Sequence, residues 1–145
     1  MKAYIVENGA AKLADLPEPT GKKITVKAVG VNRADIFHLQ GKYPAFGLEF
    51  SGDLNGKRVV GLSDGGAYAE YISTDNPHIE IPAQLDFIQA ASLLEGLVTS
   101  YYNLVDLCTL KAGEKVLIHG GASGIGIVAI QLAKLLGAEV FSTAG

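Results

Sequence analysis

The fold is decided by the stretch Lys115–Gly145, KVLIHGGASGIGIVAIQLAKLLGAEVFSTAG. Val116 to Ile118 is a short apolar run with branched side chains, typical of a parallel strand that is covered on both faces. A glycine-rich turn follows, and the apolar spacing from Ile125 to Leu136 predicts a helix that ends at Gly137. Glu139 to Thr143 predicts a second strand. The order of strand, turn, helix and strand indicates a βαβ unit.

The turn inside this stretch is a variant of the dinucleotide-binding fingerprint. Gly121 is its first glycine, Ser123 stands where the second glycine is usual, and Gly126 is the third. Such a turn directs backbone N–H groups at a helix N-terminus, where the helix dipole favours an anion. A turn used only for close packing is the alternative, but the flanking strands favour a pyrophosphate. The candidate cofactor-binding residues here are Gly121, Ala122, Ser123, Gly124, Ile125 and Gly126.

Composition narrows the class of protein. The 145 residues are 48% hydrophobic and 19% charged, which is typical of a globular chain with a sizeable core. A net charge of -3 without blocks of like charge argues against a nucleic-acid partner. Cys108 is the only cysteine, so one chain can build neither a disulfide framework nor a cysteine-rich zinc site. The N-terminus lacks a signal-peptide core and no long apolar segment follows, so we expect a cytoplasmic protein without a membrane partner.

Short predicted strands, separated by segments that contain glycine and proline, precede the βαβ unit. Asn55-Gly56 predicts a tight hairpin turn, and Asn32 can cap a short helix from Arg33 to Gln40 that ends at Gly41. Apolar residues at helical spacing from Gln84 to Leu110 predict two linking helices. The pattern favours a small β-barrel, whose predicted strands are Lys2 to Val6, Ile24 to Val31, Glu49 to Leu54, Arg58 to Leu62, Tyr68 to Ser73 and Ile79 to Ile81.

Five short motifs follow one another along the chain. They are Val31-Asn32-Arg33-Ala34-Asp35 with Gly41-Lys42-Tyr43-Pro44, Gly47-Leu48-Glu49-Phe50-Ser51-Gly52, Gly65-Gly66-Ala67-Tyr68-Ala69-Glu70-Tyr71, Leu97-Val98-Thr99-Ser100-Tyr101-Tyr102, and the glycine turn. In this order the chain resembles the first half of a medium-chain dehydrogenase/reductase of the zinc-free quinone oxidoreductase branch. The resemblance implies an α/β protein in which residues 1–110 form a GroES-like catalytic barrel with linking helices. Residues 111–145 would be the incomplete beginning of a Rossmann-type, doubly wound parallel sheet. It also implies an NADPH cofactor and the reduction of quinones or other conjugated carbonyls by hydride transfer.

The sequence departs from this family at two places. Between Gly52 and Val59 the family usually has a longer excursion, which a tight turn replaces here. The chain also stops after the second strand of a sheet that has about six strands in the usual dinucleotide-binding order. We therefore expect a fragment that is inactive alone and that is marginally stable, swapped or a homodimer along the open sheet edge. A natural short form is the alternative.

Zinc is not expected. The zinc-dependent relatives place Cys, His and Cys where this sequence has Asn32, Leu48 and Glu95, and a catalytic zinc ion needs about three protein ligands. The three histidines, which are His38, His78 and His119, lack metal-like spacing and are interpreted as surface or structural residues.

The resemblance puts Asn32, Tyr43 and Thr99 around the nicotinamide and the substrate cleft. Asn32 and Tyr43 are the catalytic candidates, and Thr99 is a cofactor-binding candidate. The Tyr43 hydroxyl could donate a hydrogen bond to a developing oxyanion. Each residue also has an ordinary interpretation: Asn32 as a helix cap, Tyr43 as cover for the loop beside Pro44, and Thr99 as a neutral helix residue.

The end of the chain bears on the choice of cofactor. NAD-binding relatives carry an Asp or Glu about 20 residues past the glycine turn, and that place falls within Ser142, Thr143, Ala144 and Gly145, where no acid occurs. A carboxylate would repel a 2′-phosphate, so its absence favours NADPH. The alternative is that the acid lies beyond Gly145.

Three functions remain open at this point. The first is an NADPH-dependent quinone or enone reductase, which takes a small-molecule substrate. The second is an enoyl-thioester reductase of the same superfamily. The third is a non-catalytic fragment or binding module that keeps the fold, and this module would oxidise no cofactor with any acceptor.

Overall fold

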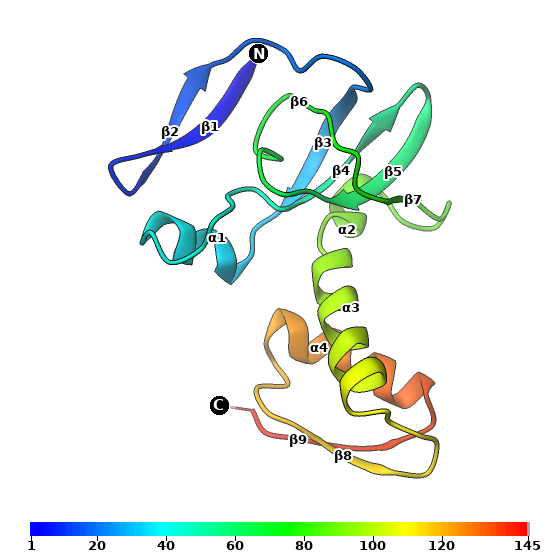
Figure 1. Cartoon of the computed structure of the whole chain (residues 1–145). Coiled ribbons are helices and arrows are strands. Elements are labelled where there is room, and N and C mark those ends of the chain that lie inside the picture. Colours follow the sequence, from blue (N-terminus) through cyan, green and yellow to red (C-terminus); the bar gives the residue numbers. More distant parts are fainter. Residues whose placement is uncertain (145) are drawn as a thin grey trace. The chain divides into compact units, whose positions relative to one another are not determined.

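The computed structural model describes residues 1–144 and contains two compact units (Figure 1). The first unit spans Met1–Leu94, and the second begins at Glu95. The division into domains at residue 110, which the sequence predicts, stays a prediction. Within residues 1–144, no helix has the length and apolar content that crossing a membrane requires.

The first unit is built on a five-stranded antiparallel sheet of order β6-β3-β4-β5-β7. The centre of the sheet is the hairpin of β4 and β5, whose register runs from Glu49↔Leu62 to Leu54↔Lys57. Its turn has left-handed backbone angles, with φ of 52° at Asn55 and 83° at Gly56, which confirms the predicted tight turn. The strands are β3 (Ile24–Gly30), β4 (Glu49–Leu54), β5 (Lys57–Leu62), β6 (Tyr71–Ile72) and β7 (His78–Glu80).

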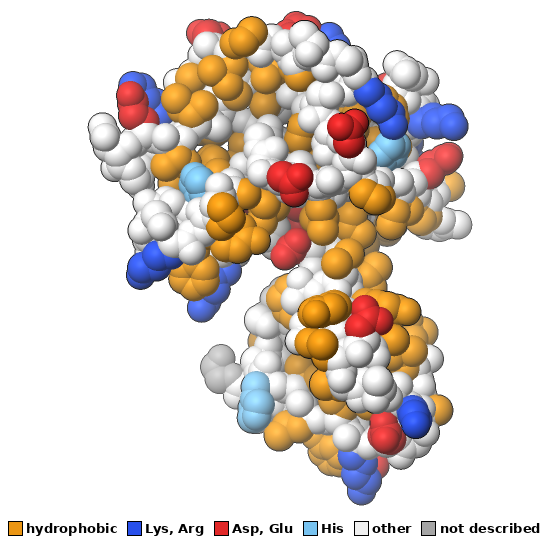
Figure 2. Space-filling view, in the orientation of Figure 1, with side chains coloured by type: hydrophobic (Ala, Val, Ile, Leu, Met, Phe, Trp, Pro, Cys, Tyr) orange, Lys and Arg blue, Asp and Glu red, His pale blue; other side chains and the backbone are white. Residues whose placement is uncertain are grey.

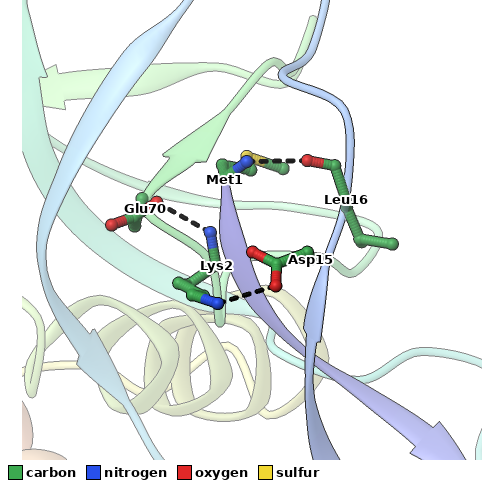
Figure 3. Close-up of polar contacts among 5 residues, drawn as sticks. All are labelled: Met1, Lys2, Asp15, Leu16 and Glu70. Carbon is green, nitrogen blue, oxygen red and sulfur yellow. Dashed lines mark hydrogen bonds and ion pairs between the residues drawn. The ribbon is translucent and has the colours of Figure 1, made fainter.

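A separate hairpin, β1 (Lys2–Glu7) and β2 (Ala10–Asp15), lies beside this sheet. The sequence did not predict β2, because its alanine-rich and mostly exposed residues lack an apolar alternation. Figure 3 shows its polar contacts: the Met1 amino group donates to the Leu16 carbonyl, and Lys2 pairs with Asp15, both at 2.7 Å. The Lys2 backbone N–H donates to Glu70 at 2.7 Å, which ties the hairpin to the segment before β6 (Figure 3).

The predicted barrel does not close. In residues 1–144 the sheet is open, with β6 and β7 as its edges, and β1 meets the segment before β6 by one isolated bridge, Ala3↔Ala69. The predicted strand over 68–73 is only two residues long in the sheet. Residues 68–70 instead form hydrogen bonds with strand β1. Tyr4 N donates to the Tyr68 carbonyl at 2.7 Å, and Glu70 N donates to the Lys2 carbonyl at 3.0 Å. Because this segment divides its hydrogen bonds between two partners, it extends neither ladder into a closed barrel.

The core of the first unit lies against the sheet. Phe50 and Ile24 are fully buried, and they pack with Leu54, Val59, Ala67 and Ile72. The short helix α2 (Phe87–Ala90) covers the strands, and the Ser51 hydroxyl donates to the Phe87 carbonyl at 2.6 Å. A second helix, α1 (Arg33–Leu39), follows β3 and confirms the predicted helix within one residue at its end.

The second unit contains a βαβ arrangement, as the sequence predicts. Strands β8 (Lys115–Ile118) and β9 (Glu139–Ser142) are parallel, and α4 (Gly124–Leu135) connects them. Leu104, Ala129 and Ala133 form the buried core between the helices and this sheet.

Two linking helices were predicted between Gln84 and Leu110, but the structure has three helical segments: α2, α3 (Leu94–Tyr101) and the π-helical turn η1 (Tyr102–Leu107).

Candidate functional site

The glycine turn contains two positions that are packed closely against their neighbours, and at Gly126 these neighbours are backbone atoms. A Cβ at Gly121 would overlap the Ser142 hydroxyl of β9. A Cβ at Gly126 would overlap the Gly120 carbonyl and lie 2.7 Å from the Cα of Gly121. The first glycine therefore allows β9 to lie close to the turn, and the third allows α4 to pack directly on it.

Helix α4 begins in a way that leaves its N-terminus accessible. Ser123 is the N-cap, and its hydroxyl accepts a hydrogen bond from Gly126 N at 3.0 Å. A Cβ at Gly124 would meet no atom within 4 Å, so this residue faces open space. The structure thus gives Ser123 the capping role and leaves Gly124 as the glycine that an approaching ligand can contact. The exposed residues of the predicted set are Ala122, Ser123, Gly124 and Ile125.

Gly120 also contributes to the turn, although it was not among the residues predicted from the sequence. Its φ is 68°, in the left-handed region, and its N–H donates to the Thr143 hydroxyl at 3.2 Å. Gly121 N donates to the Thr143 carbonyl at 2.8 Å. The end of β9, where the cofactor preference was predicted to reside, is therefore bonded to the turn; Gly145 lies outside the described residues. The signal that could have revealed Gly120 is the doubled glycine directly after the strand.

Thr99 lies on α3, next to the residues by which this helix contacts the start of α4. The buried Ser100 hydroxyl donates to the Ile125 carbonyl at 3.4 Å, and a Cβ at Gly96 would lie 3.1 Å from Val128. The Thr99 hydroxyl donates to the Glu95 carboxylate of the same helix at 3.5 Å. The backbone carbonyl of Thr99 accepts a hydrogen bond from the Asn103 side chain at 2.8 Å. The structure thus brings the helix that carries Thr99 to the glycine turn. Ser100, which the sequence analysis did not select, makes the hydrogen bond.

In the first unit, the candidate Asn32 lies at a buried carboxylate. Asp35 is 3% exposed and accepts three hydrogen bonds: from Asn32 N at 2.8 Å, Gly47 N at 2.8 Å and the Tyr68 hydroxyl at 2.7 Å. Two backbone amides and a phenol are the donors an ionised carboxylate requires when it is removed from water. Asp35 therefore joins the start of α1, the loop before β4 and the segment before β6.

The Asn32 side chain contacts a second buried acid. Its Nδ2 donates to Glu49 at 3.1 Å, and Glu49 is 2% exposed on β4. Asn32 is the N-cap residue of α1, so its backbone has the helix-cap position that was the ordinary interpretation of this residue. The hydrogen bond to Glu49 fixes the orientation of the Asn32 side-chain amide, because a carboxylate oxygen accepts only from the N–H side of that amide.

Asn32 and Leu48, two of the three positions that the sequence comparison with zinc enzymes concerns, lie in the first unit, and the absence of zinc stays a prediction. Leu48 is buried in the first unit, and Asn32 donates to an acid. Within residues 1–144, no three His, Cys, Asp or Glu side chains are grouped closely enough to hold a metal ion.

Tyr68 is the ionisable group that this environment changes most clearly. Burial raises the pKa of its phenol, and the hydrogen bond to Asp35 raises it further. Tyr68 therefore remains a neutral donor to Asp35 well above the ordinary tyrosine pKa of 10.0.

This shift predicts a loss of stability in alkali. Above about pH 10 the unfolded chain ionises Tyr68 while the folded chain does not, so the free energy of unfolding falls as the pH rises. Urea unfolding at about pH 9 and pH 11 measures this loss. We expect Tyr68→Phe to lose less stability than the wild type over this interval, and an equal loss in both would contradict the shift.

An apolar groove of about 580 Å³ lies in the first unit beside hairpin β1–β2, and Figure 2 shows hydrophobic side chains gathered over this region. Tyr4 and Leu13 of the hairpin are each 52% exposed. Tyr68 lines the groove and its hydroxyl donates to Asp35, so one side chain contacts both. The other lining residues are Lys2, Ala3, Ala11, Val26, Val29, Val31, Phe46, Ala69 and Glu70.

No family model matches the sequence. The chain is 33% identical over 148 residues to a mycocerosic acid synthase-like polyketide synthase of Mycobacterium tuberculosis, an alignment that covers 89% of this chain and 7% of that protein.

Solved structures match the whole fold. The quinone oxidoreductase of Thermus thermophilus, which was also solved with NADPH, superposes with a TM-score of 0.93 and 30% identity. The match covers 100% of this chain and 54% of that one. CurK enoyl reductase superposes with a TM-score of 0.87 and 27% identity, over 99% of this chain and 54% of that one.

This chain therefore spans about half the length of the two solved structures. The order of motifs, the βαβ arrangement and these similarities agree. The chain belongs to the medium-chain dehydrogenase/reductase superfamily, in the group that contains quinone oxidoreductases and enoyl reductases.

Proposed function

We propose that this chain is part of an NADPH-dependent, zinc-independent oxidoreductase that reduces a quinone or another conjugated carbonyl. The observation that carries the proposal is the glycine turn. Backbone atoms leave Gly126 no room for a side chain, and a Cβ at Gly121 would displace the Ser142 hydroxyl, while the N-terminus of α4 at Gly124 is open. Such a cradle fits the pyrophosphate of a dinucleotide. As part of the proposal, the first unit corresponds to the GroES-like domain and the βαβ arrangement begins a Rossmann-type sheet.

The chain's own residues would bind and orient the reactants. The backbone N–H groups at the start of α4 would hold the pyrophosphate, and Ser123 keeps the first turn of that helix in place through its bond to Gly126. When bound, the nicotinamide supplies the hydride. Asn32 and Tyr43 would polarise the substrate carbonyl by hydrogen bonds, and Thr99 would contact the cofactor.

An enoyl thioester is the second candidate substrate. The similarity to a polyketide synthase and to CurK enoyl reductase supports it. Both candidate substrates have a carbon–carbon double bond conjugated to a carbonyl, so the same hydride donor and the same carbonyl donors would act on either.

Steady-state oxidation of NADPH distinguishes the candidates. The assay compares a benzoquinone with a short enoyl thioester as acceptor, in the protein that carries this chain and in its Tyr43→Phe variant. A higher kcat/KM with the quinone supports the first candidate, and a higher value with the thioester supports the second. No oxidation with either acceptor would contradict the proposed activity and favour a non-catalytic binding module.

We also expect the protein to need no zinc. Asn32, Leu48 and Glu95 cannot supply the three ligands of a catalytic zinc site. Elemental analysis should find no stoichiometric zinc, and a chelator should leave the melting temperature unchanged. About one zinc per chain at a single site would contradict this prediction.

A further inference from the structure

Tyr43 lies in the loop between α1 and β4, and the end of α1 fixes where this loop begins. Gly41 has a φ of 70°, and its N–H donates to the His38 carbonyl at 2.9 Å. Lys42 N donates to the Phe37 carbonyl at 2.8 Å. This pair of bonds is the Schellman arrangement, which ends a helix in one defined direction.

The side chain of His38 then contacts the backbone of Tyr43 itself. His38 Nδ1 lies 2.7 Å from the Tyr43 carbonyl oxygen. A carbonyl oxygen only accepts hydrogen bonds, so Nδ1 must carry the proton in this contact. The imidazole also stacks on the Phe46 ring, with centroids 5.7 Å apart, and Phe46 packs edge-on against Tyr68 at 4.8 Å. The ring is thus held from two sides.

The far end of the loop is fixed by the same helix and by the segment before β6. Gly47 N donates to Asp35 at 2.8 Å, and Ala67 N donates to the Gly47 carbonyl at 3.0 Å. Gly66 N donates to the Phe46 carbonyl at 2.8 Å. The backbone on both sides of Tyr43 is therefore bonded, while Tyr43 remains 41% exposed.

We infer that His38 is a positioning residue that holds the backbone of Tyr43 by donating its Nδ1 proton to the Tyr43 carbonyl. This inference rests on the proposed role of Tyr43 as a hydrogen-bond donor to the substrate. A donor on an exposed loop acts well only when its backbone is fixed before the substrate arrives, because ordering it at that moment costs conformational entropy. His38 and Asp35, one turn apart on α1, hold the two ends of the loop. From the sequence alone, His38 was interpreted only as a surface or structural histidine.

The tautomer of His38 is a direct test. Long-range ¹H–¹⁵N correlation spectra of the chain, recorded over a range of pH, report which ring nitrogen of His38 carries the proton when the imidazole is neutral. We expect the Nδ1–H form at His38. Observation of the Nε2–H form would overturn the inference, because the contact with the Tyr43 carbonyl would then have no proton.

Three variants test the consequence for the loop. His38→Ala removes the donor, whereas His38→Asn keeps an N–H donor at the δ position. His78→Ala, on strand β7, is the control histidine. Loss of one hydrogen bond predicts about fivefold faster amide exchange at Lys42 and Gly47 in His38→Ala. We expect rates near wild type in His38→Asn and His78→Ala. Unchanged exchange in His38→Ala would overturn the inference, as would loss of protection in His38→Asn to the level of His38→Ala.

Failure of the inference is distinguishable from failure of the proposed function. If Tyr43→Phe leaves NADPH oxidation unchanged, the donor role of Tyr43 is wrong, while the tautomer and the exchange rates still report whether His38 holds the loop. If His38 carries its proton on Nε2 and Tyr43→Phe is slow, Tyr43 acts without positioning by His38.

Discussion

Replacing Gly126 with alanine should destabilise the second unit by about 3 kcal/mol and abolish cofactor binding. The added methyl group would overlap the Gly120 carbonyl and lie 2.7 Å from the Gly121 Cα. Both neighbours are backbone atoms, so the strain cannot be relieved by a side-chain rotation. Helix α4 would have to move off the turn, and its N-terminus would no longer face the same point. Urea unfolding followed by the amide signals of α4 measures the change.

Gly124→Ala is the matched control for this substitution. A Cβ at Gly124 meets nothing within 4 Å, and alanine in a helix is favoured over glycine by up to about 1 kcal/mol. We expect unchanged or slightly raised stability but weaker cofactor binding, because the methyl group occupies the open side of the turn. Equal destabilisation by the two variants would mean that the turn is not packed as described.

The second large effect is expected at Asp35. Asp35→Ala leaves three donors without their acceptor, two of them backbone N–H groups, in a site where the carboxylate is 3% exposed. Buried donors left unsatisfied predict a loss of about 3 to 5 kcal/mol in the free energy of unfolding. The amide of Asp35→Asn should recover only part of this loss, since its nitrogen meets a donor. Urea unfolding of the first unit gives the values.

Asp64→Ala serves as the control because Asp64 is exposed and its removal changes the net charge by the same amount. Exposed substitutions of this kind usually change stability by no more than about 0.5 kcal/mol. If Asp35→Ala cost no more than this control, the three hydrogen bonds to Asp35 would not hold the first unit together.

The parts of the fold that the sequence predicted are those in which neighbouring residues decide the structure. The Asn55-Gly56 hairpin needs only two residues with left-handed angles. The βαβ arrangement needs an apolar strand, glycines and an apolar helix in succession. The glycine turn was found for the same reason, although the local pattern could not tell that Ser123 caps α4 and that Gly124 is the open position.

The parts that were missed depend on distant residues or on weak patterns. Strand β2 forms because β1 pairs with it, since its own alanine-rich sequence has little strand preference. The barrel was predicted closed, but the segment before β6 divides its hydrogen bonds between the hairpin and the sheet. The Asp35 site joins Asp35 to Tyr68, 33 residues away. No local pattern indicates that such a carboxylate is buried, and the same holds for the contact of Glu49 with Asn32, 17 residues apart.

Titration with cofactor of the protein that carries this chain, followed by ¹⁵N-correlated spectra, tests most directly the claim that the glycine turn binds NADPH. NADPH should shift the amide signals from Gly120 to Gly126 in a saturable way, NADH should bind more weakly, and Ala144→Asp should reduce the affinity for NADPH by placing a carboxylate near its 2′-phosphate. Shifts that are absent from the turn at saturating NADPH, or tighter binding of NADH that Ala144→Asp does not alter, would contradict the account.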